Sequence, residues 1–246
     1  MSLTIELALS ERAAGRSIAL RLAEVIAAKP AAVIGVATGS SPEPIYAALA
    51  DLVRDGLDAS QVTWFALDEY LGLPAAHPQS YRSVLERALI RPLGLDPASL
   101  HVPAGLPATA DADAEAYERL IGEAQVDVQI LGIGHNGHIG FNEPGTPFAS
   151  TTHRAVLTST TRKANARYFD SLDLVPRECL TQGIATIMRA GTLELIASGA
   201  EKAPAVARAL RGPVSEDCPA SVVNLHGSVR VTVDADAASL LSSIAS

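Results

Sequence analysis

The residues best suited to chemistry stand in one short segment that follows a predominantly apolar run. Residues 126–133 are short enough to form a buried strand, and the segment after Leu131 alternates glycine with reactive side chains. Glycine lets a backbone take positive φ and approach a ligand closely. Two imidazoles and a carboxylate on such a backbone suit a site at a strand end better than a core. This segment, the glycine loop (residues 132–143), carries His135, Asn136, His138, Asn142 and Glu143 among Gly132, Gly134, Gly137 and Gly140.

The glycine loop has the groups needed for acid–base chemistry. Glu143 can orient the imidazole of His138 and raise its basicity. A zinc site at His135 and His138 would need a third ligand, and neither a cysteine nor a His-x-x-x-His pair stands nearby in the sequence. We therefore expect no metal at these histidines.

Two adjacent acids follow another apolar segment. Asp68 comes directly after Phe65-Ala-Leu67 and is followed by Glu69. Paired acids at a strand end can form a metal site, supply a general base or cap a helix, and the residues alone leave these alternatives open. Because side chains alternate along a strand, only one of the two can point into a given face.

A turn rich in hydroxyl groups follows the apolar residues 31–37. It would place backbone N–H groups and hydroxyls at a helix N-terminus, which suits a phosphate group. An ordinary strand-to-helix turn with a Ser or Thr cap explains it equally well. It is not a Walker loop, because no Gly-Lys-Ser/Thr sequence follows. The residues concerned are Thr38, Gly39, Ser40 and Ser41.

Two cations are candidates for binding the same anion. Lys202 is expected just inside a helix start, where its charge opposes the helix dipole unless an anion also binds. A solvated surface lysine is the alternative, but the similarity of residues 198–202 to residues 38–41 favours a ligand role. Arg167 suits bidentate phosphate recognition. It lies five residues after Arg162, and two helical residues at that spacing do not share a face well. One of the two is therefore expected to be structural, and sequence alone favours a structural role for Arg167.

Strand and helix patterns alternate along the chain, after a short first strand. This alternation predicts an α/β fold, with a mostly parallel sheet covered by helices on both faces in a Rossmann-like, doubly wound three-layer sandwich. We expect a single domain over residues 1–246, with its ligand at the carboxyl ends of the strands. Residues 181–188 fit either a strand or a helix. Further strands are expected at 31–37, 62–67, 126–133, 154–158, 193–197 and 229–233, and helices at 10–28, 43–53, 80–90, 111–123, 161–170, 203–210 and after the last strand.

Composition narrows the class of protein. Hydrophobic residues make up 48% of the 246 residues, which is enough for a sizeable core. The net charge of −8 and the lack of a basic block argue against nucleic acid or an anionic membrane as the main partner. Cys179 and Cys218 are isolated, as expected in a reducing compartment. Because the sequence shows neither a signal peptide nor an apolar run of membrane-spanning length, we expect a soluble cytoplasmic protein.

Three segments together resemble the glucosamine-6-phosphate deaminase (isomerase) family, and the similarity extends over most of the chain. The Gly-His-Ile-Gly-Phe-Asn-Glu-Pro sequence within the second segment is the most specific. The resemblance implies conversion of glucosamine 6-phosphate into fructose 6-phosphate and ammonia, without a metal or a redox cofactor. The segments are Phe65–Pro74 together with His77–Tyr81, Leu131–Pro144, and Thr161–Arg167.

The resemblance also implies roles for individual residues. Asp68 matches the family's base, which removes the C2 proton of the opened sugar and helps to return it at C1. His138 matches the histidine that assists ring opening, and Glu143 matches the carboxylate that supports it. Many members carry Asp two residues before this histidine, where this chain has Asn136. A neutral amide can orient His138 but cannot stabilise an imidazolium as an anion would.

The phosphate of the substrate is expected at Arg167, Lys202 and residues 38–41, which match the family's phosphate-binding groups. Some members are oligomers regulated by N-acetylglucosamine 6-phosphate. The region after Glu143 that could hold this regulator is poor in cations, with only His153 and Arg154. We therefore favour an unregulated monomer over a homo-oligomer.

Three rival functions remain from the sequence. A related 6-phosphogluconolactonase would use His138 to activate water against a sugar-phosphate lactone. A non-catalytic sugar-phosphate sensor would not need the intact set of Asp68, His138 and Glu143. A galactosamine-6-phosphate deaminase would use the same chemistry on a substrate with the other configuration at C4. This alternative stays open, because the sequence gives no indication of the preferred C4 configuration.

Overall fold

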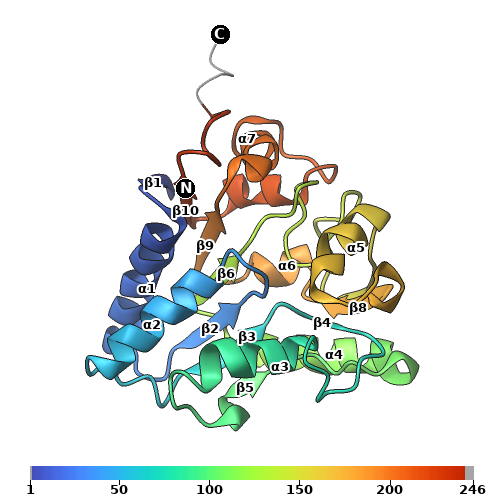
Figure 1. Ribbon diagram of the computed structural model, residues 1–246, viewed down its shortest axis with the longest axis horizontal. Coiled ribbons are helices and arrows are strands. Elements are labelled where there is room, and N and C mark those ends of the chain that lie inside the picture. The colour runs from blue at the N-terminus through green and yellow to red at the C-terminus, as the bar shows by residue number, and fades with distance from the viewer. Residues whose placement is uncertain (1, 242–246) are drawn as a thin grey trace.

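The computed structural model describes residues 2–241, and a seven-stranded sheet lies at the centre of this part of the chain (Figure 1). All neighbouring strands of this sheet run parallel. A smaller antiparallel sheet stands beside it, in the order β4 (Asp68–Tyr70), β8 (Glu178–Thr181) and β7 (His153–Val156). The main sheet has the order β1 (Ser2–Ala8), β10 (Ser228–Asp234), β9 (Thr192–Ala197), β6 (Val128–Leu131), β2 (Val33–Val36), β3 (Thr63–Ala66) and β5 (Leu100–His101).

Helices connect most of these strands, and several begin at the caps that their sequences provide. Ser10 accepts a hydrogen bond from the backbone N–H of Ala13, and Thr158 accepts one from Thr161. Such caps satisfy backbone donors that the first helical turn leaves free. The helices are α1 (Glu11–Ala28), α2 (Glu43–Arg54), α3 (Tyr81–Leu85), α4 (Ala110–Ala124), α5 (Ser159–Asn165), α6 (Ile184–Ile187) and α7 (Ala203–Arg211). Glu86–Ile90 adds a π-helical turn, and Pro97–Ser99, Pro107–Thr109, Ala166–Tyr168, Leu172–Leu174, Ala200–Lys202 and Pro219–Leu225 are 3-10 helices.

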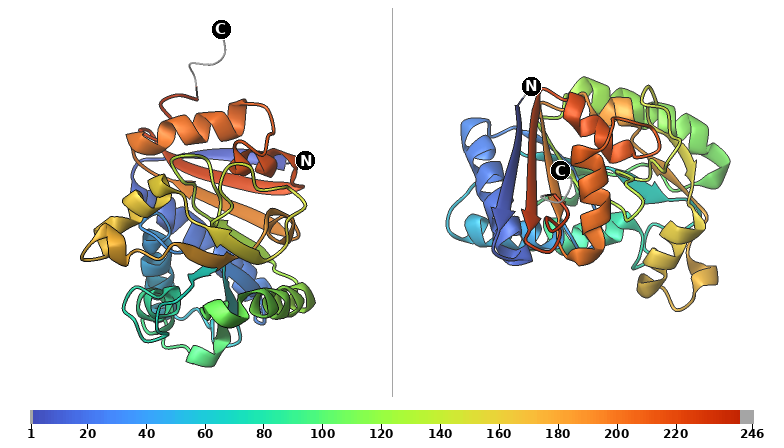
Figure 2. Two further views of the ribbon diagram at one scale, coloured as in Figure 1. Left: turned by 90° about the vertical axis from the view of Figure 1, so that its right-hand side faces the viewer. Right: turned by 90° about the horizontal axis from the view of Figure 1, so that it is seen from above.

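The main sheet is the middle layer of three. Successive residues of β2 pack on opposite faces, since Ile34 joins the core beneath α1 and α2 whereas Val33 joins Tyr117 and Ile121 of α4. Helices α6 and α7 cover the same face as α4, further along the sheet. Figure 2 shows α1 and α2 on one side of the strands and α7 on the other. The α/β sandwich predicted from the sequence is thus confirmed.

Three local features were left open by the sequence or differ from the expectation. The small antiparallel sheet was not expected, because its three-residue strand β4 is buried throughout and lacks an alternating pattern. The ambiguous residues 181–188 are divided, with Thr181 ending β8 and α6 beginning at Ile184. The expected C-terminal helix is wrong for residues 235–241, which form turns. There the backbone hydrogen bonds, from Ala238 N–H to Asp234 O and from Leu241 N–H to Ala238 O, close separate turns instead of the continuous i to i+4 series of a helix. Residues 242–246 lie outside the described part of the chain.

Four neighbouring strands of the main sheet bring the chemically interesting loops together. β9, β6, β2 and β3 are adjacent, and each carries its loop at the carboxyl end. After β2 the chain moves to β3 on one side, whereas after β6 it reaches β9 on the other. Loops diverge at such a switch in direction and leave a crevice in which ligands bind.

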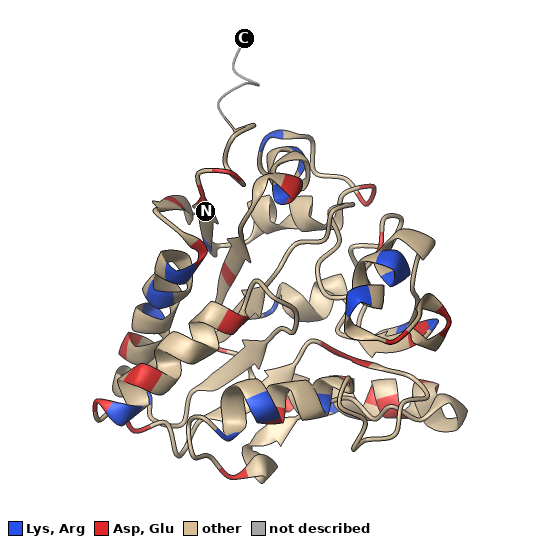
Figure 3. Ribbon diagram, in the orientation of Figure 1, with Lys and Arg blue, Asp and Glu red and all other residues tan. Residues whose placement is uncertain are grey.

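Charged residues of both signs are spread over the ribbon (Figure 3), in keeping with a net charge of −8 and a sequence without a basic block. Among the described residues, the helices fall short of the length and apolarity that crossing a membrane requires.

Candidate active site

A cavity of about 470 Å³ opens at the carboxyl ends of these strands. The turn after β2, the glycine loop after β6 and the segment after β9 all contribute to its wall, as does the region of α5. Glu143 is set back behind the wall, where it contacts His138. The other residues predicted for the site line the cavity itself, and they are Thr38, Gly39, Ser40, Ser41, Asp68, Asn136, His138, Arg167 and Lys202.

The two adjacent acids of β4 have different surroundings. Asp68 lines the cavity and is only 6% exposed. Its burial, with a further contribution from the charge of Glu69, raises the pKa of Asp68 well above its ordinary value. Glu69 accepts hydrogen bonds from the backbone N–H groups of Tyr70, Tyr81 and Arg82 and thereby caps the start of α3. Of the alternatives left open by the sequence, Glu69 is therefore the helix cap, and Asp68 is the carboxyl group free to meet a ligand.

The glycine loop folds tightly enough to hold an imidazole against its own backbone. The N–H of Gly134 donates to the carbonyl of His138 over 2.9 Å, and Gly137 has a φ of 89°. A Cβ atom at Gly134 would lie 2.2–2.4 Å from three ring atoms of His138. Glycine is required at position 134, because the imidazole occupies the space that any side chain would need.

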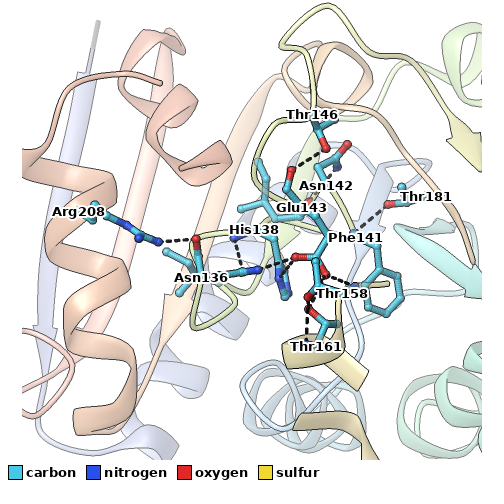
Figure 4. A network of polar contacts seen from close by, with 12 residues as sticks. Asn136, His138, Phe141, Asn142, Glu143, Thr146, Thr158, Thr161, Thr181 and Arg208 are labelled. Atoms are coloured by element: carbon cyan, nitrogen blue, oxygen red, sulfur yellow. Dashed lines mark hydrogen bonds and ion pairs between the residues drawn. The ribbon is translucent and has the colours of Figure 1, made fainter. Parts of the chain in front are cut away.

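Glu143 supports this imidazole from behind (Figure 4). Its Oε2 faces Nδ1 of His138 at 3.5 Å, and its Oε1 accepts hydrogen bonds from the N–H and hydroxyl of Thr158 and from the hydroxyl of Thr161. Burial alone would raise the pKa of Glu143. The contacts with His138, Thr161 and Asn136 outweigh that effect and lower the pKa to about 2. Glu143 is therefore an anion across the ordinary pH range.

Asn136 completes this group through its side-chain amide. Nδ2 of Asn136 donates to Oε2 of Glu143 over 2.5 Å, and Oδ1 accepts a hydrogen bond from the backbone N–H of His138 over 3.3 Å. The amide thus binds the carboxylate and the loop backbone, rather than the imidazole ring. An aspartate at this position would place a second carboxylate against Glu143.

The cavity wall also carries two cations. Nη2 of Arg167 lies 3.4 Å from the hydroxyl of Ser40 and 2.8 Å from that of Tyr168. Nζ of Lys202 donates to the carbonyl of Ile133 over 3.0 Å. Burial lowers the pKa of Lys202, the nearby Arg167 lowers it further, and Glu201 opposes both effects. An anion bound between the two cations would relieve their mutual repulsion.

The turn at residues 38–41 stands next to these cations at the start of α2. Gly39 has a φ of 97°, a conformation that other residues rarely adopt. Pro42 occupies the cap position and makes no side-chain hydrogen bond to the helix. The turn is thus not the Ser- or Thr-capped type that the sequence also allowed, and the positive end of the helix dipole is directed towards the cavity wall.

Comparison with known proteins identifies the family. The sequence profile of the glucosamine-6-phosphate isomerase and 6-phosphogluconolactonase family matches residues 7–232. The chain belongs to this family. Similar proteins include glucosamine-6-phosphate deaminases from Bifidobacterium longum, 49% identical over 94% of this chain and 90% of that protein, and from Streptomyces coelicolor, 49% identical over 94% and 89%.

Solved structures agree with this membership. The fold matches that of a monomeric glucosamine-6-phosphate deaminase with a TM-score of 0.93 at 41% identity, over 96% of this chain and 99% of that one. It also matches the 6-phosphogluconolactonase of Trypanosoma brucei with a TM-score of 0.76 at 20% identity, over 98% and 99%. The second likeness concerns the fold alone.

Of two further residues considered in the sequence, Arg162 and His135, only His135 lines the cavity. The guanidinium of Arg162 donates to the carbonyls of Leu172 and Val175, so that Arg162 is the structural member of the arginine pair. His135 is 40% exposed and lies 3.5 Å from Glu201. Within residues 2–241, His, Cys, Asp and Glu side chains form no group of three that could hold a metal ion.

Other polar residues at or next to the cavity were not recognised from the sequence. Nδ2 of Asn165 donates to the hydroxyl of Tyr70 over 2.8 Å, and the rings of Tyr70 and Tyr81 lie 4.6 Å apart beside Asp68. Thr158 and Thr161 hold Glu143. Thr158 could have been suspected as a cap just before a helical segment, but the sequence does not indicate that its hydroxyl also reaches a carboxylate fifteen residues earlier.

Proposed function

We propose that this chain is a glucosamine-6-phosphate deaminase, which forms fructose 6-phosphate and ammonia from glucosamine 6-phosphate and water. The arrangement of the cavity supports this most directly, because a buried carboxyl group and an imidazole backed by a carboxylate share it with a pair of cations. Relatives that carry this name are 49% identical over 94% of the chain. The reaction moves protons between carbon and oxygen atoms and transfers no electrons to an acceptor.

Asp68 is the base in this proposal. Its carboxylate removes the proton from C2 of the opened sugar and returns it at C1, which leaves an iminium group at C2. Water then adds to C2, and ammonia leaves from the resulting carbinolamine to give the ketone. A base whose pKa is raised by burial is stronger once ionised and is closer to the working pH, where proton transfer is most efficient. This environment supports Asp68 over Glu69, whose carboxylate is already occupied by three backbone donors.

His138 and Glu143 assist ring opening. The imidazole passes a proton to the ring oxygen as the C1–O bond breaks, and it takes the proton of the C1 hydroxyl. The fixed anion of Glu143, 3.5 Å from Nδ1, stabilises the imidazolium while it carries the proton. Asn136 keeps Glu143 in place but adds no negative charge.

Arg167, Lys202 and the turn at residues 38–41 hold the phosphate. The proximity of the two cations to each other and to the helix start supports this assignment. A dianionic group bound there supplies binding energy that positions C1 and C2 against Asp68, which lines the same cavity.

One assay separates this proposal from hydrolysis of a lactone. Purified protein is given glucosamine 6-phosphate, galactosamine 6-phosphate and 6-phosphogluconolactone side by side, and release of ammonia or acid is followed. We expect ammonia from glucosamine 6-phosphate at the highest kcat/KM. Acid release from the lactone without ammonia release from either amino sugar would reject the deaminase.

We also propose that the whole chain forms one domain and acts as a monomer. We further propose that N-acetylglucosamine 6-phosphate does not regulate it. The similar solved deaminase is described as monomeric. Arg154, a cation expected near a regulatory site, is bound to Glu178 over 2.6 Å. Sedimentation should give the mass of a single chain, and rate curves with and without the regulator should coincide. A cytoplasmic location stays a prediction.

A further inference from the structure

Arg208, a residue of α7 that has no part in the mechanism above, contacts the glycine loop. Its Nη2 donates a hydrogen bond to the backbone oxygen of Asn136 (Figure 4). Lys202, just before α7, holds the same loop at Ile133 through a 3.0 Å hydrogen bond. Two side chains from one helical segment therefore bind backbone oxygens three residues apart in the loop.

The residue that Arg208 holds is the one that binds the acid–base pair. The side chain of Asn136 donates to Oε2 of Glu143 over 2.5 Å and accepts from the N–H of His138 over 3.3 Å. A hydrogen bond is sensitive to changes of a few tenths of an ångström. A displacement of the Asn136 backbone would therefore loosen its amide from Glu143, and Glu143 would face His138 in a less constant geometry.

The loop leaves room for this contact because a glycine follows Asn136. A Cβ atom at Gly137 would lie 2.9 Å from Nη2 of Arg208 and 2.7 Å from the sulfur of Cys218. The carbonyl of Gly137 also accepts a hydrogen bond from the N–H of Ala220 over 2.8 Å. Arg208 and Ala220 thus hold neighbouring carbonyls at the tip of the turn.

We propose that Arg208 is a positioning residue, which fixes Asn136 and through it the Glu143–His138 pair during the deaminase reaction. This inference rests on the proposed function. Because Arg208 is exposed on the outer side of the loop and does not line the cavity, it acts through Asn136 and not by touching the substrate.

The test compares kcat and KM for glucosamine 6-phosphate in Arg208 variants. We expect Arg208→Ala to lower kcat about tenfold, or about 1.4 kcal/mol in activation free energy. KM should stay within about twofold, because the phosphate-binding groups are unchanged. Arg208→Lys can still donate to the carbonyl and should recover part of kcat. Arg211→Ala, on an exposed position of the same helix, is the matched control and should retain wild-type rates.

A double-mutant cycle with Asn136→Ala shows whether the effect passes through Asn136. We expect Arg208→Ala to change kcat less than about twofold in the Asn136→Ala background. An equal loss in both backgrounds, a rise in KM alone, or an unchanged kcat would overturn the positioning role. Arg208→Lys gives the same comparison if Arg208→Ala does not fold. A wild-type protein that releases no ammonia would overturn the proposed function itself and this role with it.

Discussion

Asp68 and Glu69 are adjacent in β4, yet the first carboxyl group lines the cavity and the second caps α3. The alternation of side chains along a strand separates the two groups. It leaves one acid buried without compensating donors, and its pKa is raised well above the ordinary value. The burial of Asp68 therefore has two consequences: it makes the carboxylate a stronger base in its proposed role, and it makes the folded protein less stable when this carboxyl group is ionised. The two effects can be measured separately.

Asp68→Asn should lower kcat for glucosamine 6-phosphate by at least about 10³, because the proton at C2 then has no base. Substrate binding should persist, since the phosphate-binding groups are not altered. Steady-state rates measure the first effect, and calorimetric titration with the substrate measures the second. Near-normal turnover would exclude Asp68 as the base.

The same substitution should stabilise the protein at neutral and higher pH. The folded-state pKa of Asp68 is raised, so wild-type stability is fully present below the unfolded-state pKa and is lost as pH rises towards the folded-state value. Each pKa unit corresponds to about 1.4 kcal/mol. We expect Asp68→Asn to raise the Tm by about 3 °C or more at pH 8, with the gain vanishing below about pH 4.

Thermal unfolding from pH 3.5 to pH 8 measures this difference, with Asp173→Asn as the control on an exposed aspartate. The control should change the Tm by no more than about 2 °C at every pH. A gain from Asp68→Asn that was largest at low pH would show that the carboxyl group is stabilised in its charged form instead.

Lys202→Ala should raise the KM for glucosamine 6-phosphate roughly 10- to 100-fold, because a hydrogen bond to a charged group contributes about 1.5–3 kcal/mol. The kcat should change only a few-fold, and competitive inhibition by inorganic phosphate should weaken in parallel. Lys163→Ala, which removes an exposed lysine of α5, is the matched control. If KM and phosphate inhibition both remained unchanged, the phosphate would have to bind elsewhere.

Gly134→Ala should lower kcat about 100-fold while the fold is kept. The added methyl group would overlap the imidazole of His138, whose atoms lie within 2.4 Å of its position, and the ring must turn away from Glu143. Overpacking of this kind costs about 1–3 kcal/mol in stability. Gly122→Ala, on an exposed position of α4 with open space around it, should leave kcat unchanged. Equal activities of the two variants would mean that the orientation of His138 does not limit the rate.

Sequence alone predicted the sandwich and the edge at which the site lies. Apolar segments such as Val33–Val36 and Thr192–Ala197 are buried on both faces of the sheet. A continuous apolar run of this kind is a local feature of the sequence and indicates a parallel strand. Each of these strands ends in glycine or hydroxyl residues, and parallel strands bring such ends to one edge. Asp68, His138 and Lys202 could therefore be gathered into one site before any coordinates were known.

Tertiary structure decided which polar group serves which purpose. Whether Asp68 or Glu69 faces the cavity depends on the pairing of β4 with β8, a strand more than a hundred residues away. The anion at Glu143 depends on hydroxyls from α5, and the loop tip is held by Arg208 from α7. Hydrogen bonds form between groups that folding brings within about 3 Å of each other. The spacing of residues along the chain does not indicate which distant groups will come that close.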